Sequence, residues 1–88
     1  MKYSVQFTKR SAKELNKLDR FTQSYILKWI EKNLEGCDNP RIHGKALTGD
    51  KSGFWRYRIG DYRLLCEIRD NVLVILVVEI GHRSEIYN

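Results

Sequence analysis

GFWRYRIGDYRLLCEI, residues 53–68, alternates between large apolar and charged side chains and is interrupted once, by Gly60-Asp61. Alternation with a period of two predicts β-strands. A two-residue connection with glycine first is typical of a type II′ turn. The stretch is therefore predicted to form a β-hairpin, and its turn fixes a register in which Arg58 faces Arg63.

The two faces of this hairpin differ, because successive side chains point to opposite sides of a strand. One face is apolar and is predicted to lie in the core: Trp55, Tyr57, Ile59, Tyr62, Leu64, Cys66 and Ile68. The other, which we call the arginine face, carries Arg56, Arg58 and Arg63 with Leu65 and Glu67. Like charges opposed across two strands are destabilising. The arginines are therefore either fully hydrated or presented to a polyanion.

The remaining segments supply two helices and two strands. Residues 2–7 alternate like a short strand. Helices are predicted from Lys9 to Leu18 and from Arg20 to Leu34, with Thr8 and Asp19 as N-caps. Residues 72–80 are apolar at nearly every position, which is typical of a strand buried on both faces. We expect an α/β fold of the α+β type, in which an N-terminal helical hairpin packs on a mainly antiparallel four-stranded sheet of order 1-4-3-2, with residues 55–59 at the edge.

The last strand extends the arginine face. In a regular strand, Val74, Leu76 and Val78 lie on that face beside Leu65, which makes it half basic and half apolar. Such an apolar half needs cover, either from Ile86-Tyr87 or from a partner chain. The end of the strand is expected to bring further polar residues toward the arginines, so that one cluster contains Arg56, Arg58, Arg63, His82, Arg83 and Tyr87.

Size and composition predict one domain, residues 1–88, with a single modest core. The net charge of +5 favours an anionic partner, although many small basic domains are simply soluble. The two cysteines have no metal-ligand spacing, and no metal or cofactor is expected. The chain has no apolar run of membrane-spanning length and no apolar leader, so we expect a cytoplasmic protein without a membrane partner.

A cluster of arginines matches the geometry of phosphate oxygens. RNA can be cleaved without a metal, because the 2′-hydroxyl can attack the adjacent phosphate when a base, an acid and stabilising cations are present. His82 and Tyr87 are the titratable groups predicted near the arginines. A lone histidine is more often structural, and Tyr87 is as well suited to sealing the apolar half of the face as to stacking on a base. Lys45, Lys13 and Lys17 are candidate RNA-backbone contacts or simply hydrated charges.

Four segments together resemble one known family: Asn39-Pro40-Arg41, Gly44-Lys45-Ala46-Leu47, residues 53–64 and residues 80–87. The chain resembles the RelE/ParE superfamily of toxin–antitoxin toxins over its whole length, and the RelE branch in particular. The resemblance implies a microbial-ribonuclease-like fold and an endoribonuclease that cuts mRNA in the ribosomal A site. It also implies a RelB-like antitoxin that blocks the toxin and brings it to operator DNA.

The resemblance also implies roles for single residues. Arg63 matches the arginine that binds the scissile phosphate, and Tyr87 matches the tyrosine that stacks on a substrate base. His82 or Arg83 matches the basic residue after the last strand. Arg56 and Arg58 occupy positions that are often lysine in RelE, where a lysine can serve as the base. The main alternative is a ParE-type toxin, which binds DNA gyrase and cleaves no RNA. A further alternative is an inactive relative that only binds an antitoxin.

Overall fold

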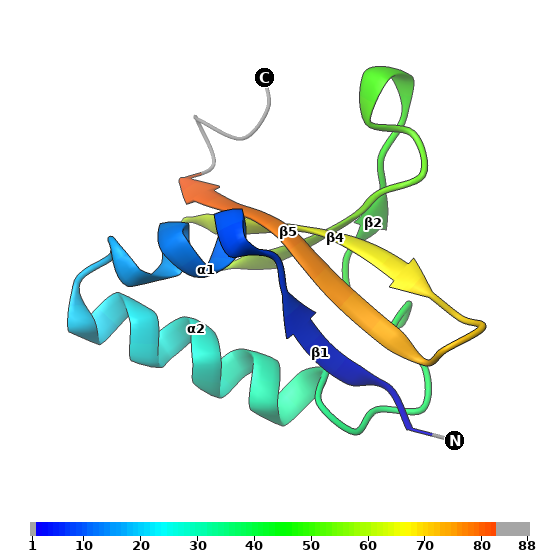
Figure 1. Ribbon diagram of the computed structural model, residues 1–88, viewed down its shortest axis with the longest axis horizontal. Helices are drawn as coiled ribbons and strands as arrows, with labels where there is room; N and C mark the ends of the chain where they lie inside the picture. The colour runs from blue at the N-terminus through cyan, green and yellow to red at the C-terminus, as the bar shows by residue number, and fades with distance from the viewer. Residues whose placement is uncertain (1, 83–88) are drawn as a thin grey trace.

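The computed structural model describes residues 2–82. Along the chain one strand is followed by two helices and then by the remaining strands, which are interrupted by a short 3₁₀ turn (Figure 1). Their bounds are β1 (Ser4–Phe7), α1 (Lys9–Asn16), α2 (Arg20–Asn33), β2 (Lys45–Ala46), the 3₁₀ turn η1 (Gly49–Lys51), β3 (Trp55–Ile59), β4 (Tyr62–Arg69) and β5 (Val74–His82).

The strands form one five-stranded sheet in the order β1-β5-β4-β3-β2. β1 pairs with β5 in parallel and the other neighbours are antiparallel, so the predicted order of the four long strands is confirmed. The expected edge is wrong, because β2 adds a short fifth strand outside β3. Lys45 pairs with Arg56 and Ala46 with Trp55, so on this side of the sheet β2 covers the first half of β3 and leaves its second half unpaired.

The hairpin of β3 and β4 has the predicted register. Ile59 faces Tyr62 and Arg58 faces Arg63. Gly60 has a φ of 59° and Asp61 has a negative φ, which is the pattern of a type II′ turn. The like-charged pair inferred from the sequence is therefore a real feature of the sheet.

Both helices begin directly after the N-cap residues predicted from the sequence. The side chain of Thr8 accepts a hydrogen bond from the backbone of Ser11, and that of Asp19 accepts one from Thr22. The predicted helical hairpin is different in detail, because α1 ends at Asn16 and packs mainly on β5. α2 instead covers the sheet with Ile26 and Ile30, which are both buried.

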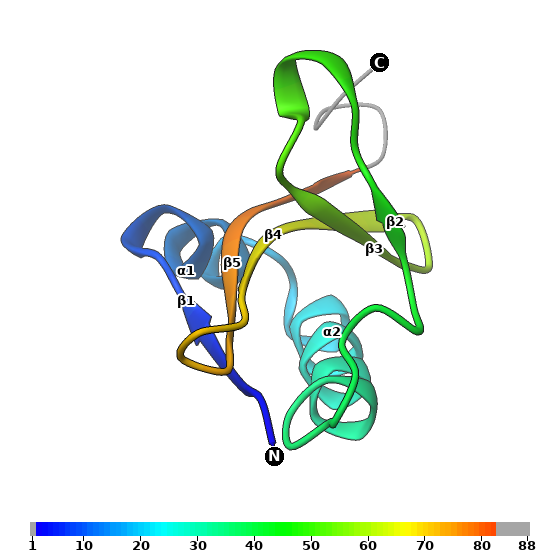
Figure 2. The same ribbon diagram turned by 90° about the vertical axis from the view of Figure 1, so that its right-hand side faces the viewer.

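The core lies between α2 and one face of the sheet. Tyr57, Leu64 and Ile75 are fully buried there. Figure 2 shows α2 on this side and the loop that contains η1 rising on the opposite side. The arginine face is therefore the face that α2 leaves uncovered, and the η1 loop borders it.

A β-bulge at Val78 changes the end of β5. Cys66 pairs with Val77, but Leu65 pairs with Glu79, so Val78 is an extra residue on β5. One inserted residue reverses the direction of every side chain that follows it. Ile80 accordingly points into the core, where it is 4% exposed, and Glu79 points to the arginine face.

Candidate functional site

Paired residues on neighbouring strands share a face, so the register defines rows of side chains across the arginine face. One row contains Lys45, Arg56, Leu65 and Glu79. The next row contains Arg58, Arg63 and Gly81. Three arginines and a lysine therefore occupy neighbouring positions of one rigid sheet, which is the arrangement that binding a phosphate requires.

Arg63 is at the floor of the arginine face. Its side chain is only 7% exposed, although Arg58 directly opposite it is exposed. Gly81, its partner on β5, adds no side chain to the row. A guanidinium with so little access to water interacts more strongly with a bound anion than a hydrated one does, because screening is weaker. Leu65, at 2% exposure, contributes an apolar wall beside it.

Glu79 brings a carboxylate to this face. It stands in the row next to Arg63, diagonally across β4 and β5, and such diagonal neighbours are about 7–8 Å apart and within reach of long side chains. Its Oε1 lies 3.6 Å from Nη2 of Arg10 on α1, and its side chain is 13% exposed. Sequence reasoning did not identify Glu79, because the regular strand it assumed directs this residue to the core.

His82 reaches the predicted end of the sheet but lies on the other face. It pairs directly with Tyr62, and the two rings make an edge contact with centroids 5.6 Å apart. With Glu14, Lys17 and Tyr62 it lines a hollow beside α1. The predicted cluster of His82 with the arginines is therefore wrong in this structure. The cause is the bulge at Val78, which turns His82 to the helix side.

The sequence is similar to those of known toxins. A family model described as the ParE toxin of type II toxin–antitoxin systems matches residues 5–87. A putative RelE-like toxin protein from Escherichia coli is 36% identical over all of this chain and 93% of its own length. The chain belongs to the RelE/ParE superfamily of type II toxin–antitoxin toxins.

Two further relatives connect this superfamily member to the RelE branch. The mRNA interferase toxin RelE of Escherichia coli K12 is 31% identical, with 100% of this chain and 93% of the relative aligned. The toxin–antitoxin complex RelBE2 from Mycobacterium tuberculosis contains a chain with a TM-score of 0.85 and 27% identity, over 97% of this toxin and 95% of that chain. The predicted RelE-like fold is thus confirmed.

The predicted RNA-contacting lysines fall in two places in this toxin. Lys45 joins the arginine face beside Arg56. Lys13 is exposed on α1 and Lys17 is exposed at the C-cap of that helix, where it lines the hollow that contains His82. Arg83 and Tyr87, the other two predicted site residues, lie outside the residues that the structure describes, as does the predicted covering segment Ile86-Tyr87.

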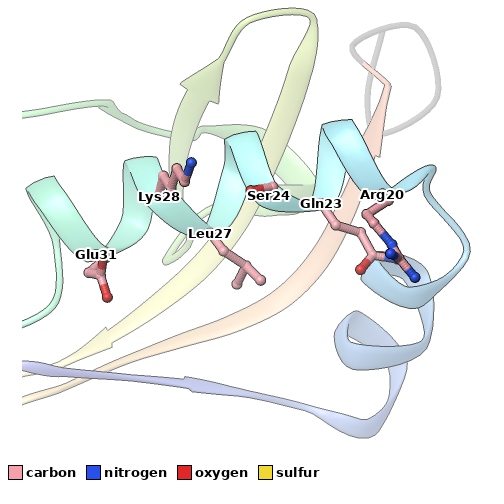
Figure 3. Close-up of a pocket in the computed structure, with 6 residues that line it drawn as sticks. All are labelled: Arg20, Gln23, Ser24, Leu27, Lys28 and Glu31. Atoms are coloured by element: carbon pink, nitrogen blue, oxygen red, sulfur yellow. The ribbon is translucent and has the colours of Figure 1, made fainter.

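A second hollow, along α2, lies away from the arginines. Arg20, Gln23, Leu27 and Glu31 follow one side of the helix there (Figure 3). This surface mixes both signs of charge and lacks the convergence of cations that marks the arginine face. We therefore place the candidate site of the toxin on the sheet.

Neither buried core group with a raised pKa takes part in this site. Burial raises the pKa of the Cys66 thiol and that of the Tyr57 hydroxyl, so both stay neutral at physiological pH. The Tyr57 hydroxyl donates a hydrogen bond of 2.6 Å to the carbonyl of Pro40. Residues 2–82 contain no group of His, Cys, Asp and Glu suited to a metal ion, and no helix among them is long and apolar enough to cross a membrane.

Proposed function

We propose that this toxin is an endoribonuclease that inhibits translation by cleaving mRNA on the ribosome. The observation that carries the proposal is Arg63, held almost without exposure on the arginine face with Arg56 and Arg58 beside it. A relative whose name is mRNA interferase toxin supports the same activity. The cationic face matches the chemistry, because phosphoryl transfer depends on positioning and on stabilising negative charge.

The reaction proposed is attack of a 2′-hydroxyl on the adjacent phosphate, which needs no metal. Arg63 holds the scissile phosphate, and Arg56 and Arg58 stabilise the charge of the pentavalent transition state. Glu79 accepts the 2′-proton, since a carboxylate on this face is a competent base. The bond to the 5′-oxygen then breaks, the 5′-oxygen takes a proton from water, and a 2′,3′-cyclic phosphate remains.

Two residues outside the described range, Arg83 and Tyr87, enter this proposal with the roles that the family resemblance implies. Arg83 adds positive charge near the leaving group and Tyr87 stacks on a substrate base. The chain offers few groups for proton transfer, so the ribosome is proposed to align the message in the A site. Lys13 and Lys17 on α1 would then contact ribosomal RNA rather than the scissile phosphate.

We further propose that a RelB-like antitoxin binds and blocks the arginine face, and that operator DNA is bound only through the antitoxin complex. Support comes from a solved relative, which is a toxin–antitoxin complex. The half-buried Leu76 stands in the row next to that of Arg56, and half-buried Val74 stands one row further, so the face suits an acidic amphipathic segment. No antitoxin is needed for the cleavage itself.

The test is expression of the toxin in a translation extract, followed by mapping of mRNA 5′ ends. New ends phased with codons on ribosome-bound message are expected, and Arg63→Ala should remove them, with a loss of cleavage of about 10³-fold. Lys32→Gln, a charge loss on the outer end of α2, is the control and should cut normally. Intact message with the native toxin would contradict the proposal.

The second candidate function is binding to DNA gyrase, because the matching family model is described as the ParE toxin. A gyrase inhibitor has no need for a buried arginine on an open face, which favours the nuclease. Gyrase trapped on cleaved DNA, together with intact mRNA in the same extract, would establish this second function.

A further inference from the structure

A basic hollow continues the arginine face around the outer edge of the sheet. It has a volume of about 300 Å³ and lies where β3 extends past β2. Its lining residues come from α2, from the loop before β2, and from β2 and β3: Trp29, His43, Gly44, Lys45, Arg56 and Arg58. Three of the six are cations and none is a carboxylate.

The loop that forms this hollow is held firmly against β3. The indole Nε1 of Trp55 donates a hydrogen bond of 2.7 Å to the carbonyl of His43. Gly44 has a φ of 82°, and a Cβ there would meet the carbonyl oxygen of Arg56 at 2.3 Å. The loop can approach β3 this closely because position 44 has no side chain. His43 and Lys45 are therefore displayed at fixed positions on either side of it.

One wall of the hollow is aromatic. The rings of Trp29 and His43 make an edge contact with centroids 5.6 Å apart, and Trp29 packs in turn on buried Tyr57 at 5.8 Å. Trp29 is thus anchored to the core, while His43 is exposed. An aromatic surface next to a group of cations is the combination with which proteins bind unpaired nucleotides.

We propose that this hollow is a second nucleotide subsite, for a residue of single-stranded RNA that flanks the cleaved bond. Lys45 binds its phosphate, and the base stacks on His43 against Trp29. Arg58 lines the hollow and directly faces Arg63 across β3 and β4, so a single RNA strand can follow the cations from one to the other. The inference rests on the proposed function, since it assigns substrate contacts beyond the scissile phosphate.

Binding of a six-nucleotide single-stranded RNA to the full chain tests the subsite without cleavage. The RNA carries 2′-O-methyl groups on every nucleotide that has a 3′-phosphate, so that no 2′-hydroxyl can attack a phosphate and the strand stays intact. In NMR spectra the indole N–H of Trp29, assigned with Trp29→Phe, is expected to shift on titration. His43→Ala should weaken binding about tenfold through lost stacking, and His43→Phe should restore it.

Salt dependence separates the phosphate contact from the stacking contact. Lys45→Gln should weaken binding and reduce the slope of log K against log salt by about 0.7, the value for one phosphate of a single strand. His43→Ala should leave that slope unchanged. Lys2→Gln removes the same charge next to β1, at the opposite edge of the sheet from β2, and is the matched control, with native affinity and slope expected.

Three outcomes would overturn the inference. The first is native affinity for the RNA in both His43→Ala and Lys45→Gln. The second is a shift of the same signals by inorganic phosphate as large as that by the RNA at equal concentration, which indicates an anion site without a base. The third is a shift by the RNA of residues around Arg63 alone. Absence of mRNA cleavage in the translation extract, with these titrations as expected, would remove the proposed function but leave RNA binding in the hollow.

Discussion

Arg58 and Arg63 face each other across β3 and β4, and the two residues differ sharply in their access to water. Arg58 is exposed, whereas Arg63 is 7% exposed. Two like charges in directly opposed positions disfavour the hairpin that carries them. This pair concentrates positive charge at one place on the sheet, and a bound phosphate would reduce the repulsion between the two guanidinium groups. The arrangement is typical of a functional site that costs some stability.

Arg58→Thr is expected to stabilise the fold while it weakens the activity. Threonine suits a strand, and its introduction removes the repulsion with Arg63, so the free energy of unfolding should rise by about 0.2–1 kcal/mol. Cleavage of mRNA should fall about tenfold. Urea unfolding at low salt measures the first effect. Arg58→Lys keeps the charge and is the control; a Thr variant less stable than the Lys variant would argue against the repulsion.

Glu79→Gln tests the proposed base. The change keeps the size of the side chain and removes its ability to accept a proton, so single-turnover cleavage should fall by about 10²-fold or more. Glu67→Gln is the matched control, because Glu67 lies on the same face but pairs with Leu76, far from Arg63. Glu67 is also ion-paired to an arginine, as Glu79 is. Equal rates in the two variants would exclude Glu79 as the base.

His82→Gln should have little effect on cleavage. His82 pairs with Tyr62 on the helix-facing side of the sheet, so its imidazole is separated from the arginine face by the backbone of β5. Single-turnover rates within about threefold of the native rate are expected. A loss of about 10²-fold with unchanged thermal stability would return His82 to the role that its position in the sequence predicted.

The hairpin and the end of β5 show which parts of this fold can be predicted from sequence patterns and which cannot. Alternation and a turn glycine predicted the hairpin register correctly, because both signals are local. The bulge at Val78 was not predicted, although the residue types that follow it indicate that the strand is irregular. Regular alternation would bury Glu79 and expose Ile80, which is unfavourable for both residues. That mismatch indicates an irregularity before Glu79, but it does not show which residue is inserted.

The strand β2 and the basic hollow could not be predicted, because tertiary contacts create them. Lys45 and Ala46 are too few to show any alternation. They become a strand only because Gly44 permits a close approach and Trp55 bonds to the carbonyl of His43. The sequence did mark Lys45 as a candidate contact, and its pairing with Arg56 places it on the predicted face. Its neighbours Trp29 and His43 came together through packing alone.

Asp70 connects the turn between β4 and β5 to two distant segments and makes stability depend on pH. Its carboxylate accepts a hydrogen bond of 2.6 Å from the Tyr3 hydroxyl and two from the Arg41 guanidinium, at 3.0 and 2.9 Å. Hydrogen bonds from Arg41, and then from Tyr3, lower the pKa of Asp70 from 3.8 to about 2. A pKa lowered by folding contributes stability that is complete above about pH 4 and is lost as the pH falls toward 2.

Asp70→Asn should therefore flatten the dependence of unfolding on pH between about 4 and 2, where the native chain loses stability. Urea midpoints measured at several pH values across this window provide the readout. Some slope should remain, because hydrogen bonds from Thr22 also lower the pKa of Asp19 at the start of α2. Asp19→Asn keeps a capping side chain, and combining it with Asp70→Asn should flatten the curve further. A slope unchanged by Asp70→Asn would show that the Tyr3–Asp70–Arg41 contacts do not depend on the charge of Asp70.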